Sequence, residues 1–180
     1  IRGLTLLDRY RLETRIGRGA MGVIWRAFDL KADKPIALKA LSNQIYQNES
    51  AVVHLRRAVE KNAPLSNPHI VGIHEFVTAP QFIGISMELV EGEQASTLRN
   101  NKANGVFEAS DIREWIEPLC SALQYAHDTG VAVHGDLKPA HLLLCTGQTL
   151  KIADFGISAK VDKKGGNDAR PNVGTVGYMS

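Results

Sequence analysis

Two aspartates stand in segments where a carboxylate can do chemistry. Asp136 lies within His-Gly-Asp-Leu-Lys-Pro, and eighteen residues later Asp154 opens an Asp-Phe-Gly triplet after an apolar run. Two carboxylates at strand or loop ends can divide the work: one accepts or orients a hydroxyl proton, and the other holds Mg²⁺ against nucleotide phosphates. A lone aspartate near Gly or Pro more often forms an Asx turn or a helix cap. Other parts of the chain must therefore decide between the two interpretations.

A glycine-rich turn and a lysine precede these aspartates. Gly17, Gly19 and Gly22 separate two β-type runs, and positions without side chains let backbone N–H groups approach phosphate oxygens closely. That pattern alone is weak, because a tight hairpin also uses glycine. After the second run comes Ile-Ala-Leu-Lys, in which Lys39 ends an apolar strand and points a charge that needs a partner into an interior or cleft. Four such elements in one order favour a nucleotide site over isolated turns.

The scaffold for these residues is predicted to have strands first and helices later. The strand-type runs are residues 10–16, 23–28, 35–41, 70–76 and 82–90. The first three form an antiparallel meander. A helix over Glu49–Asn62 must end before Pro64, because the residue preceding a proline disfavours the α region.

A second, longer helix is predicted over residues 110–128. Apolar side chains recur there at intervals of three and four and place one stripe against a core; they are Ile112, Trp115, Ile116, Leu119, Leu123 and Ala126. Pro118 should kink this helix. Residues 90–92 are predicted to join a strand-rich half to a helix-rich half.

The composition fits a folded protein without a strongly charged partner. Hydrophobic residues make up 44% and charged residues 22%, and the net charge of +2 is too small to imply nucleic acid or anionic membrane as a partner. Cys120 and Cys145 lack metal-type spacing, which argues against zinc and for a reducing compartment. No apolar run is long enough to cross a bilayer, and the charged first thirty residues are unlike a signal peptide. We therefore expect a cytoplasmic protein.

Taken together, the motifs resemble the protein kinase family, specifically the bacterial serine/threonine kinases. They are Gly17-x-Gly19-x-x-Gly22, Ile36-Ala37-Leu38-Lys39, Met87-Glu88-Leu89-Val90-Glu91-Gly92, His134-x-Asp136-x-Lys138-Pro139, Asp154-Phe155-Gly156 and Gly174-Thr175-Val176-Gly177-Tyr178-Met179. The resemblance covers nearly the whole chain. It implies an α+β, two-lobed fold: an N-lobe with an antiparallel sheet and one helix (1–88), a hinge (89–92), and a mainly helical, partial C-lobe that ends in the activation segment (93–180).

The resemblance also implies transfer of the ATP γ-phosphate to a protein serine or threonine hydroxyl, with Mg²⁺. Asp136 would be the catalytic base, Lys138 would contact the γ-phosphate, Asp154 would bind Mg²⁺, and Lys39 would pair the α and β phosphates. The other implied nucleotide contacts are Gly17, Gly19 and Gly22 over the phosphates, the backbone of Glu88 and Val90 at the adenine edge, and Ile24, Ala37 and Leu143 on its faces. The substrate protein stays unknown.

The first predicted helix departs from the family's pattern. Aligned on the Leu-Ser-x-Pro-x-Ile-Val segment that follows it, this helix has Ala58 where the family has the glutamate that pairs the strand lysine. Glu60 is roughly 200° away around the helix, so it reaches Lys39 only if the helix shifts or rotates. Asn62 replaces an apolar residue that the family stacks on the Phe155 ring. We expect a helix that is swung out.

Two further departures lie in the catalytic loop. His141 stands where the family has an asparagine that binds a second Mg²⁺, and imidazole suits Mg²⁺ poorly because this ion requires oxygen at short distance. We expect a packed, hydrogen-bonded histidine, with a preference for Mn²⁺ as the alternative. Gly135 replaces an arginine that in many members holds an activation-loop phosphate. Between Gly156 and Thr175 the only hydroxyl residue is Ser158, so we expect no control by phosphorylation there.

Two other function classes stay open. Small-molecule phosphotransferases that resemble aminoglycoside and choline kinases share the His-Gly-Asp spelling, but they usually lack the Asp-Phe-Gly and Gly-Thr-x-Gly-Tyr-Met segments found here. A pseudokinase, acting as a nucleotide-binding or nucleotide-free scaffold, is favoured by Ala58, Asn62 and His141. The lysine and the two aspartates oppose it. If the missing clamp and metal ligand together remove on the order of 4–7 kcal/mol, phosphoryl transfer slows by about 10³ to 10⁵.

The ends of the chain indicate an excerpt. It begins at Ile1 and stops at Ser180, where the family continues with an Ala-Pro-Glu segment and further helices. We expect a longer protein, in which a regulatory, sensor or membrane domain can lie. These 180 residues alone would expose the apolar stripe of the longer helix, so we expect them to be inactive and either to aggregate or to pair with another chain as a dimer.

Overall fold

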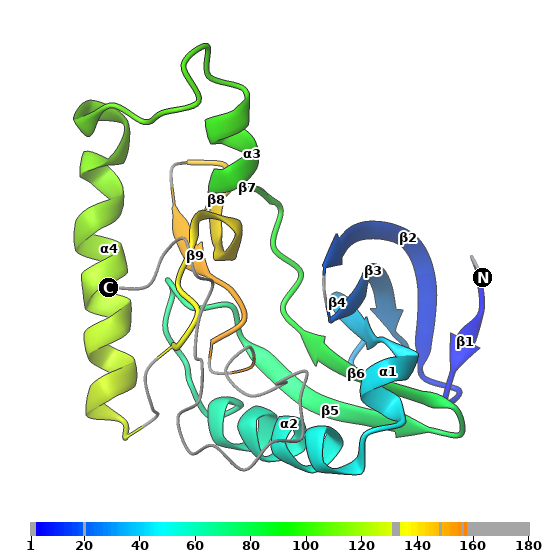
Figure 1. Cartoon of the computed structure of the whole chain (residues 1–180). Coiled ribbons are helices and arrows are strands. Elements are labelled where there is room, and N and C mark those ends of the chain that lie inside the picture. Colours follow the sequence, from blue (N-terminus) through cyan, green and yellow to red (C-terminus); the bar gives the residue numbers. More distant parts are fainter. Residues whose placement is uncertain (1–2, 20, 131–133, 148, 156, 158–180) are drawn as a thin grey trace. The chain divides into compact units, whose positions relative to one another are not determined.

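The computed structural model describes residues 3–19, 21–130, 134–147, 149–155 and 157, and its elements are drawn in Figure 1. The chain divides into two compact units, of which the first contains Ile1–Pro64 and Gly72–Leu89 and the second contains Leu65–Val71 and Val90–Ser180. The Gly-Thr-x-Gly-Tyr-Met motif and Ser158 lie outside the described residues. No helix in the described ranges is both long enough and apolar enough to cross a membrane.

A six-stranded antiparallel sheet forms most of the first unit. Its strands are β1 (Thr5–Leu6), β2 (Tyr10–Gly19), β3 (Gly22–Asp29), β4 (Lys34–Leu41), β5 (Ile73–Ala79) and β6 (Phe82–Met87), in the order β1-β2-β3-β4-β6-β5. The predicted meander is confirmed as β2, β3 and β4. Strand β5 begins later than predicted, because Ile70 and Val71 pair instead with Ile152 in the second unit.

The two faces of this sheet carry different side chains. One face holds an apolar cluster of Tyr10, Leu12, Ala27, Ile36, Leu38 and Val77. Side chains alternate along a strand, so Ala37 and Lys39 point to the opposite face. Ile24 of β3 lies directly across from Lys39 and shares that face. The predicted run 35–41 is confirmed as β4, whose last residues pair with the start of β3. Lys39 therefore lies two residues before the end of this strand.

Helix α2 (Glu49–Asn62) has the bounds predicted from the sequence and follows the short helix α1 (Asn43–Tyr46), which was not predicted. The Asn48 side chain caps α2 by accepting the N–H of Ala51 at 3.0 Å. The helix packs against β5, where the Arg56 guanidinium lies 4.9 Å from the centre of the Phe76 ring and donates to Thr78 at 3.1 Å. These contacts attach α2 to the sheet of its own unit.

The second unit combines two helices with a small sheet. The helices are α3 (Ala95–Asn100) and α4 (Ala109–Asp128), and the strands are β7 (Gly92–Gln94), β8 (Leu142–Cys145) and β9 (Leu150–Ile152), in the order β7-β8-β9. An apolar cluster lies between α4 and β9; its buried members are Leu65, Ile70, Ala122, Ala126, Ile152 and Phe155. This cluster supports the strands from which the loops of the candidate site begin.

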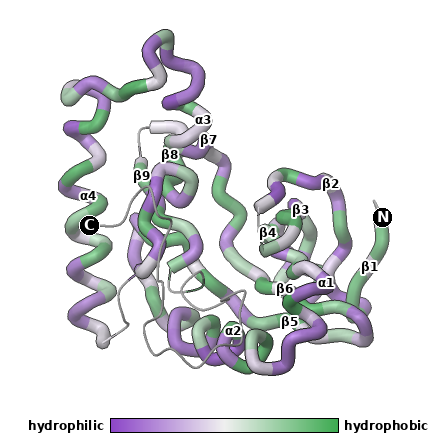
Figure 2. The backbone as a smooth tube through the Cα atoms, in the orientation of Figure 1, coloured by the Kyte–Doolittle hydropathy of each residue, from purple (hydrophilic) through white to green (hydrophobic). Residues whose placement is uncertain are grey.

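Helix α4 matches the predicted long helix and continues through Pro118. Figure 2 shows hydrophobic and hydrophilic residues alternating along it. One member of the predicted stripe is wrong: Ile116 is 53% exposed. Ile116 lies at the margin of the stripe: at roughly 100° per residue, its side chain is about 80° around the helix from that of Ala126. Ala122, which was not named, is fully buried instead.

A partly buried ion pair joins the residue before β2 to the last residue of β3. Arg9 donates to both carboxylate oxygens of Asp29, at 2.8 and 2.7 Å, and contacts Glu75 at 2.8 Å. The hydrogen bonds from Arg9, with others from the backbone of Lys31 and Ala32, lower the pKa of Asp29 from 3.8 to about 2. A carboxylate whose pKa is lower in the folded state stabilises folding above the unfolded pKa.

Folding should therefore weaken as this carboxylate is protonated. Between pH 6 and pH 3, Asp29 should remove about 1 kcal/mol from the free energy of unfolding. Asp29→Asn should lower the free energy of unfolding by about 2 kcal/mol at pH 6. It should also reduce the change in this free energy between pH 6 and pH 3 by about 1 kcal/mol. Urea unfolding at both pH values, followed by tryptophan fluorescence, measures this, with Asp33→Asn in the neighbouring exposed turn as the control. An unchanged pH dependence in Asp29→Asn would contradict the assignment.

Candidate active site

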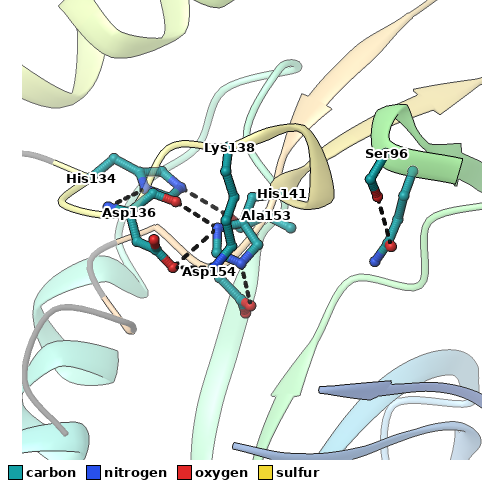
Figure 3. A network of polar contacts seen from close by, with 8 residues as sticks. Ser96, His134, Asp136, Lys138, His141, Ala153 and Asp154 are labelled. Atoms are coloured by element: carbon teal, nitrogen blue, oxygen red, sulfur yellow. Dashed lines mark hydrogen bonds and ion pairs between the residues drawn. The ribbon is translucent and has the colours of Figure 1, made fainter. Parts of the chain in front are cut away.

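Two loop segments of the second unit carry the acidic groups. The first is residues 134–138, which lead into the 3-10 turn η1 (Pro139–His141), and the second follows β9. The His134 ring donates from Nε2 to the carbonyl oxygen of Ala153 at 2.9 Å, and the Ala153 N–H donates to the carbonyl of His141 at 2.8 Å. These two bonds hold the segments side by side. Figure 3 shows the resulting network around His134, Asp136, Lys138, His141, Ala153 and Asp154.

Asp136 and Lys138 form an ion pair within this loop. The Lys138 ammonium lies 2.7 Å from Oδ2 of Asp136, whose side chain is only 10% exposed. The Asp136 N–H donates to Nδ1 of His134 at 3.3 Å, which fixes the backbone before the carboxylate. A carboxylate that can accept a hydroxyl proton thus lies next to a cation suited to phosphate.

His141 connects the two aspartates. Its Nδ1 lies 2.8 Å from the carbonyl oxygen of Asp136, and its Nε2 lies 3.6 Å from Oδ2 of Asp154. A carbonyl oxygen can only accept, so Nδ1 carries the proton and donates it. Burial lowers the pKa of His141, although the Asp154 charge acts in the opposite direction. At neutral pH the ring is therefore uncharged, and its unprotonated Nε2 faces Asp154.

His134 is a site residue to which sequence reasoning assigned no role. It is buried, its ring packs edge-on against Phe155 with centroids 4.9 Å apart, and burial lowers its pKa. Its two nitrogens bridge the loops that carry Asp136 and Asp154, as one donor and one acceptor. Its place two residues before Asp136 was the available signal, but the bridge needs a partner nineteen residues away.

Two residues of the site have a left-handed backbone. Asp154 has φ +58° and Gly135 has φ +81°. The left-handed region costs a residue with a Cβ roughly 1–2 kcal/mol, and aspartate tolerates it better than most. Gly135 adopts it without that cost. The backbone conformation therefore gives a reason for glycine at position 135, where the family's pattern has an arginine.

The glycine-rich turn joins β2 to β3 in the first unit. A Cβ on Gly22 would lie 2.0 Å from the Ala40 carbonyl oxygen, so the strand pairing itself requires glycine there. A Cβ on Gly19 would meet no atom within 4 Å, and one on Gly17 would only touch the Ile24 side chain at 3.6 Å. These contacts do not require glycine at the two positions, and the predicted close approach of a phosphate stays a prediction.

Helix α2 presents no carboxylate on its buried side. That side consists of Ala51, Leu55, Val59 and Asn62, while Ala58 is half-buried and Glu60 is exposed. The Asn62 amide donates from Nδ2 to the Ala58 carbonyl at 2.7 Å, and its Oδ1 is buried without a hydrogen-bond partner. The predicted swung-out position of α2 relative to Phe155 concerns both units and stays a prediction.

The other residues named from the sequence divide between the units. The first unit holds Gly17, Gly19, Gly22, Ile24, Ala37, Lys39 and Glu88, and the second holds Val90, Asp136, Lys138, His141, Leu143 and Asp154. The Glu88 N–H already donates to Gly72 at 2.8 Å, which leaves the carbonyl as its group for adenine. Lys39 is buried, at 4% exposed. Its convergence with the aspartates on one nucleotide stays a prediction.

The donor atoms fit one Mg²⁺ but not the second that the family's pattern implies. Mg²⁺ binds proteins through one or two carboxylates and takes its other ligands from water and phosphates, which suits Asp154. The nitrogen of His141 does not suit it. Within the described part of the chain, no group of three or more His, Cys, Asp or Glu could hold a metal ion by itself. Nucleotide phosphates would have to complete the coordination.

Known proteins are similar to this chain in sequence and in fold. PknA of Mycobacterium tuberculosis is 31% identical over 99% of this chain, and a probable serine/threonine-protein kinase of Clostridium acetobutylicum is 29% identical over 99%. The chain spans 42% and 27% of these two relatives. The crystal structure of the Mycobacterium tuberculosis PknI kinase domain matches with a TM-score of 0.78 and 28% identity, covering 87% of this chain and 63% of that one.

The likeness in structure confirms the predicted α+β, two-lobed kinase fold. The family model described as "Protein kinase domain" matches residues 10–180. The chain therefore belongs to the protein kinase domain family.

Proposed function

We propose that this chain is part of an ATP-dependent protein serine/threonine kinase, which transfers the γ-phosphate of ATP to a hydroxyl of a protein substrate. The observation that carries the proposal is the Asp136–Lys138 ion pair, joined through His141 to Asp154. The names of the relatives support the serine/threonine class. Membership of the protein kinase family favours a protein over a small-molecule acceptor.

The residues of the loop would act on the incoming hydroxyl and on the phosphate. In the transfer, the bond between γ-phosphorus and the substrate oxygen forms, the bond to the β–γ bridging oxygen breaks, and ADP leaves. Asp136 orients the hydroxyl and accepts its proton. Lys138 neutralises charge on the transferred group, and Asp154 would hold Mg²⁺, an ion that would supply charge neutralisation at the phosphate oxygens. Lys39 would position the α and β phosphates.

A pseudokinase is the second candidate function, and one observation in the first unit favours it. The buried side of α2 carries one amide and apolar groups and no carboxylate, where the family's pattern has a glutamate. A kinase without this clamp keeps nucleotide binding but loses positioning of the phosphates. The two candidates therefore differ in phosphoryl transfer and agree in nucleotide binding.

Phosphoryl transfer should depend on the Asp136 carboxylate. With radiolabelled ATP and either Mg²⁺ or Mn²⁺, the intact protein should label itself or a general protein substrate. Asp136→Asn should reduce incorporation by at least about 10²-fold, because the amide cannot accept a proton. Asp128→Asn, at the exposed end of α4, should leave the rate unchanged. Nucleotide-dependent thermal stabilisation without incorporation would support the scaffold, and the absence of both signals would indicate a nucleotide-free module.

Substitutions of Gly22 and Gly19 should separate an effect on folding from an effect on nucleotide binding. Gly22→Ala should destabilise the protein by about 1–3 kcal/mol, because its Cβ overlaps the Ala40 carbonyl. Gly19→Ala meets no atom and should leave the melting temperature within a few degrees, while ATP binds about tenfold more weakly. Thermal melting and fluorescent-nucleotide titration measure the two effects. Full nucleotide affinity in Gly19→Ala would show that the loop does not approach phosphate.

A further inference from the structure

The orientation of the His141 ring leaves one nitrogen, Nε2, without a hydrogen bond within the described residues. Its Nδ1 donates to the Asp136 carbonyl at 2.8 Å and orients the ring. An asparagine amide could make the same bond to this carbonyl, so the hydrogen bond alone does not call for imidazole. The second nitrogen, Nε2, faces Oδ2 of Asp154 at 3.6 Å. With the ring proton on Nδ1, Nε2 presents a lone pair on the side of this carboxylate oxygen.

This geometry is that of a metal-ligating histidine. Such a histidine donates its other ring N–H to a backbone carbonyl or carboxylate, which fixes the tautomer and makes the ligating nitrogen more basic. His141 does this with the carbonyl of Asp136. Two ligand atoms at about 2.1–2.2 Å from one cation lie about 3.0–3.6 Å apart when the angle between them is roughly 90–110°. The 3.6 Å separation of Nε2 and Oδ2 is at the upper end of this range.

The ligand types select the cation. Mg²⁺ prefers oxygen, whereas imidazole suits Zn²⁺, Fe²⁺, Ni²⁺ and Cu²⁺. Mn²⁺ stands at the oxygen-preferring end of the first-row series, so histidine coordination of Mn²⁺ is the most demanding test. We propose that His141 Nε2 and the Asp154 carboxylate together bind a transition-metal dication, for which Mn²⁺ is the test ion, and that His141 makes this ion preferred over Mg²⁺ as the second cation. The proposal rests on the proposed function, because nucleotide phosphates must supply further ligands. Mn²⁺ binding should therefore be strong only when nucleotide is present.

Electron spin-echo spectroscopy tests the ligand directly. The intact protein is loaded with Mn²⁺ and a non-hydrolysable ATP analogue, and nitrogen coupling to Mn²⁺ is recorded. The coupling should change from the ¹⁴N to the ¹⁵N pattern when the protein is produced with ¹⁵N-labelled histidine, which also excludes nitrogen from adenine. This measurement needs no variant. Unchanged coupling, or no coupling at all, would overturn the proposal.

A variant then assigns the nitrogen to one histidine. His141→Asn should abolish the histidine coupling and weaken Mn²⁺ binding about tenfold or more, measured from the signal of unbound Mn²⁺. Nucleotide affinity in Mg²⁺ should stay within about twofold. His127→Asn, at an exposed position of α4, is the matched control and should keep the coupling. Histidine coupling that persists in His141→Asn would contradict the assignment.

The same titrations distinguish this proposal from the proposed function. Nucleotide that binds with Mg²⁺ while Mn²⁺ shows no histidine coupling overturns only the metal proposal. Nucleotide that binds with neither cation overturns both. A preference for Mn²⁺ over Mg²⁺ that reverses in His141→Asn supports the proposal, independently of the rate of phosphoryl transfer.

Discussion

The candidate site depends on the pairing of two loop segments through the backbone at Ala153. Asp136 and Asp154 are eighteen residues apart in the chain. They come close because the β8–β9 hairpin brings the chain back beside the loop that carries Asp136. The hydrogen bonds of Ala153 with His134 and His141 then secure the two segments. Buried backbone groups need such partners. Because a three-stranded sheet this short is weak alone, the apolar cluster under β9 must support it.

The two histidines of the site place polar groups in a setting that excludes much of the water. His134 is buried and His141 is nearly so, and burial keeps both rings uncharged. A buried imidazole is costly unless its nitrogens have partners. Both nitrogens of His134 have them. His141 satisfies one nitrogen and turns the other toward Asp154, which is the kind of local imbalance that functional sites retain.

The residues of the second unit keep most of the family's motif residues, whereas α2 of the first unit departs from the family's pattern. In the second unit the two aspartates and Lys138 lie in one network of polar contacts. In the first unit α2 buries Asn62, leaves Ala58 half-buried and exposes Glu60. The residues proposed to react with the substrate and those proposed to position the phosphates lie on different elements. A substitution in one group can therefore leave the other group unchanged. A chain of this kind can lose rate without losing the reacting groups.

The sequence by itself determined the local elements and the family. The bounds of α2 followed from Asn48 and Pro64, and the meander followed from apolar runs and the glycine turn, because caps, breakers and periodicity act over a few residues. The fold class followed from the resemblance of the ordered motifs to the protein kinase family. Even so, the predicted burial of Ile116 was wrong, since the neighbours of the helix decide it.

Only the tertiary structure decided how the side chains of the site face one another. The left-handed backbone of Gly135, the bridge made by His134 and the direction of the His141 nitrogens depend on carbonyls and strands distant in the chain. Hydrogen bonds between such groups leave no periodic signal in the residues that make them. The sequence could name His141 as unusual, but the tautomer and the atom that faces Asp154 are properties of the folded loop.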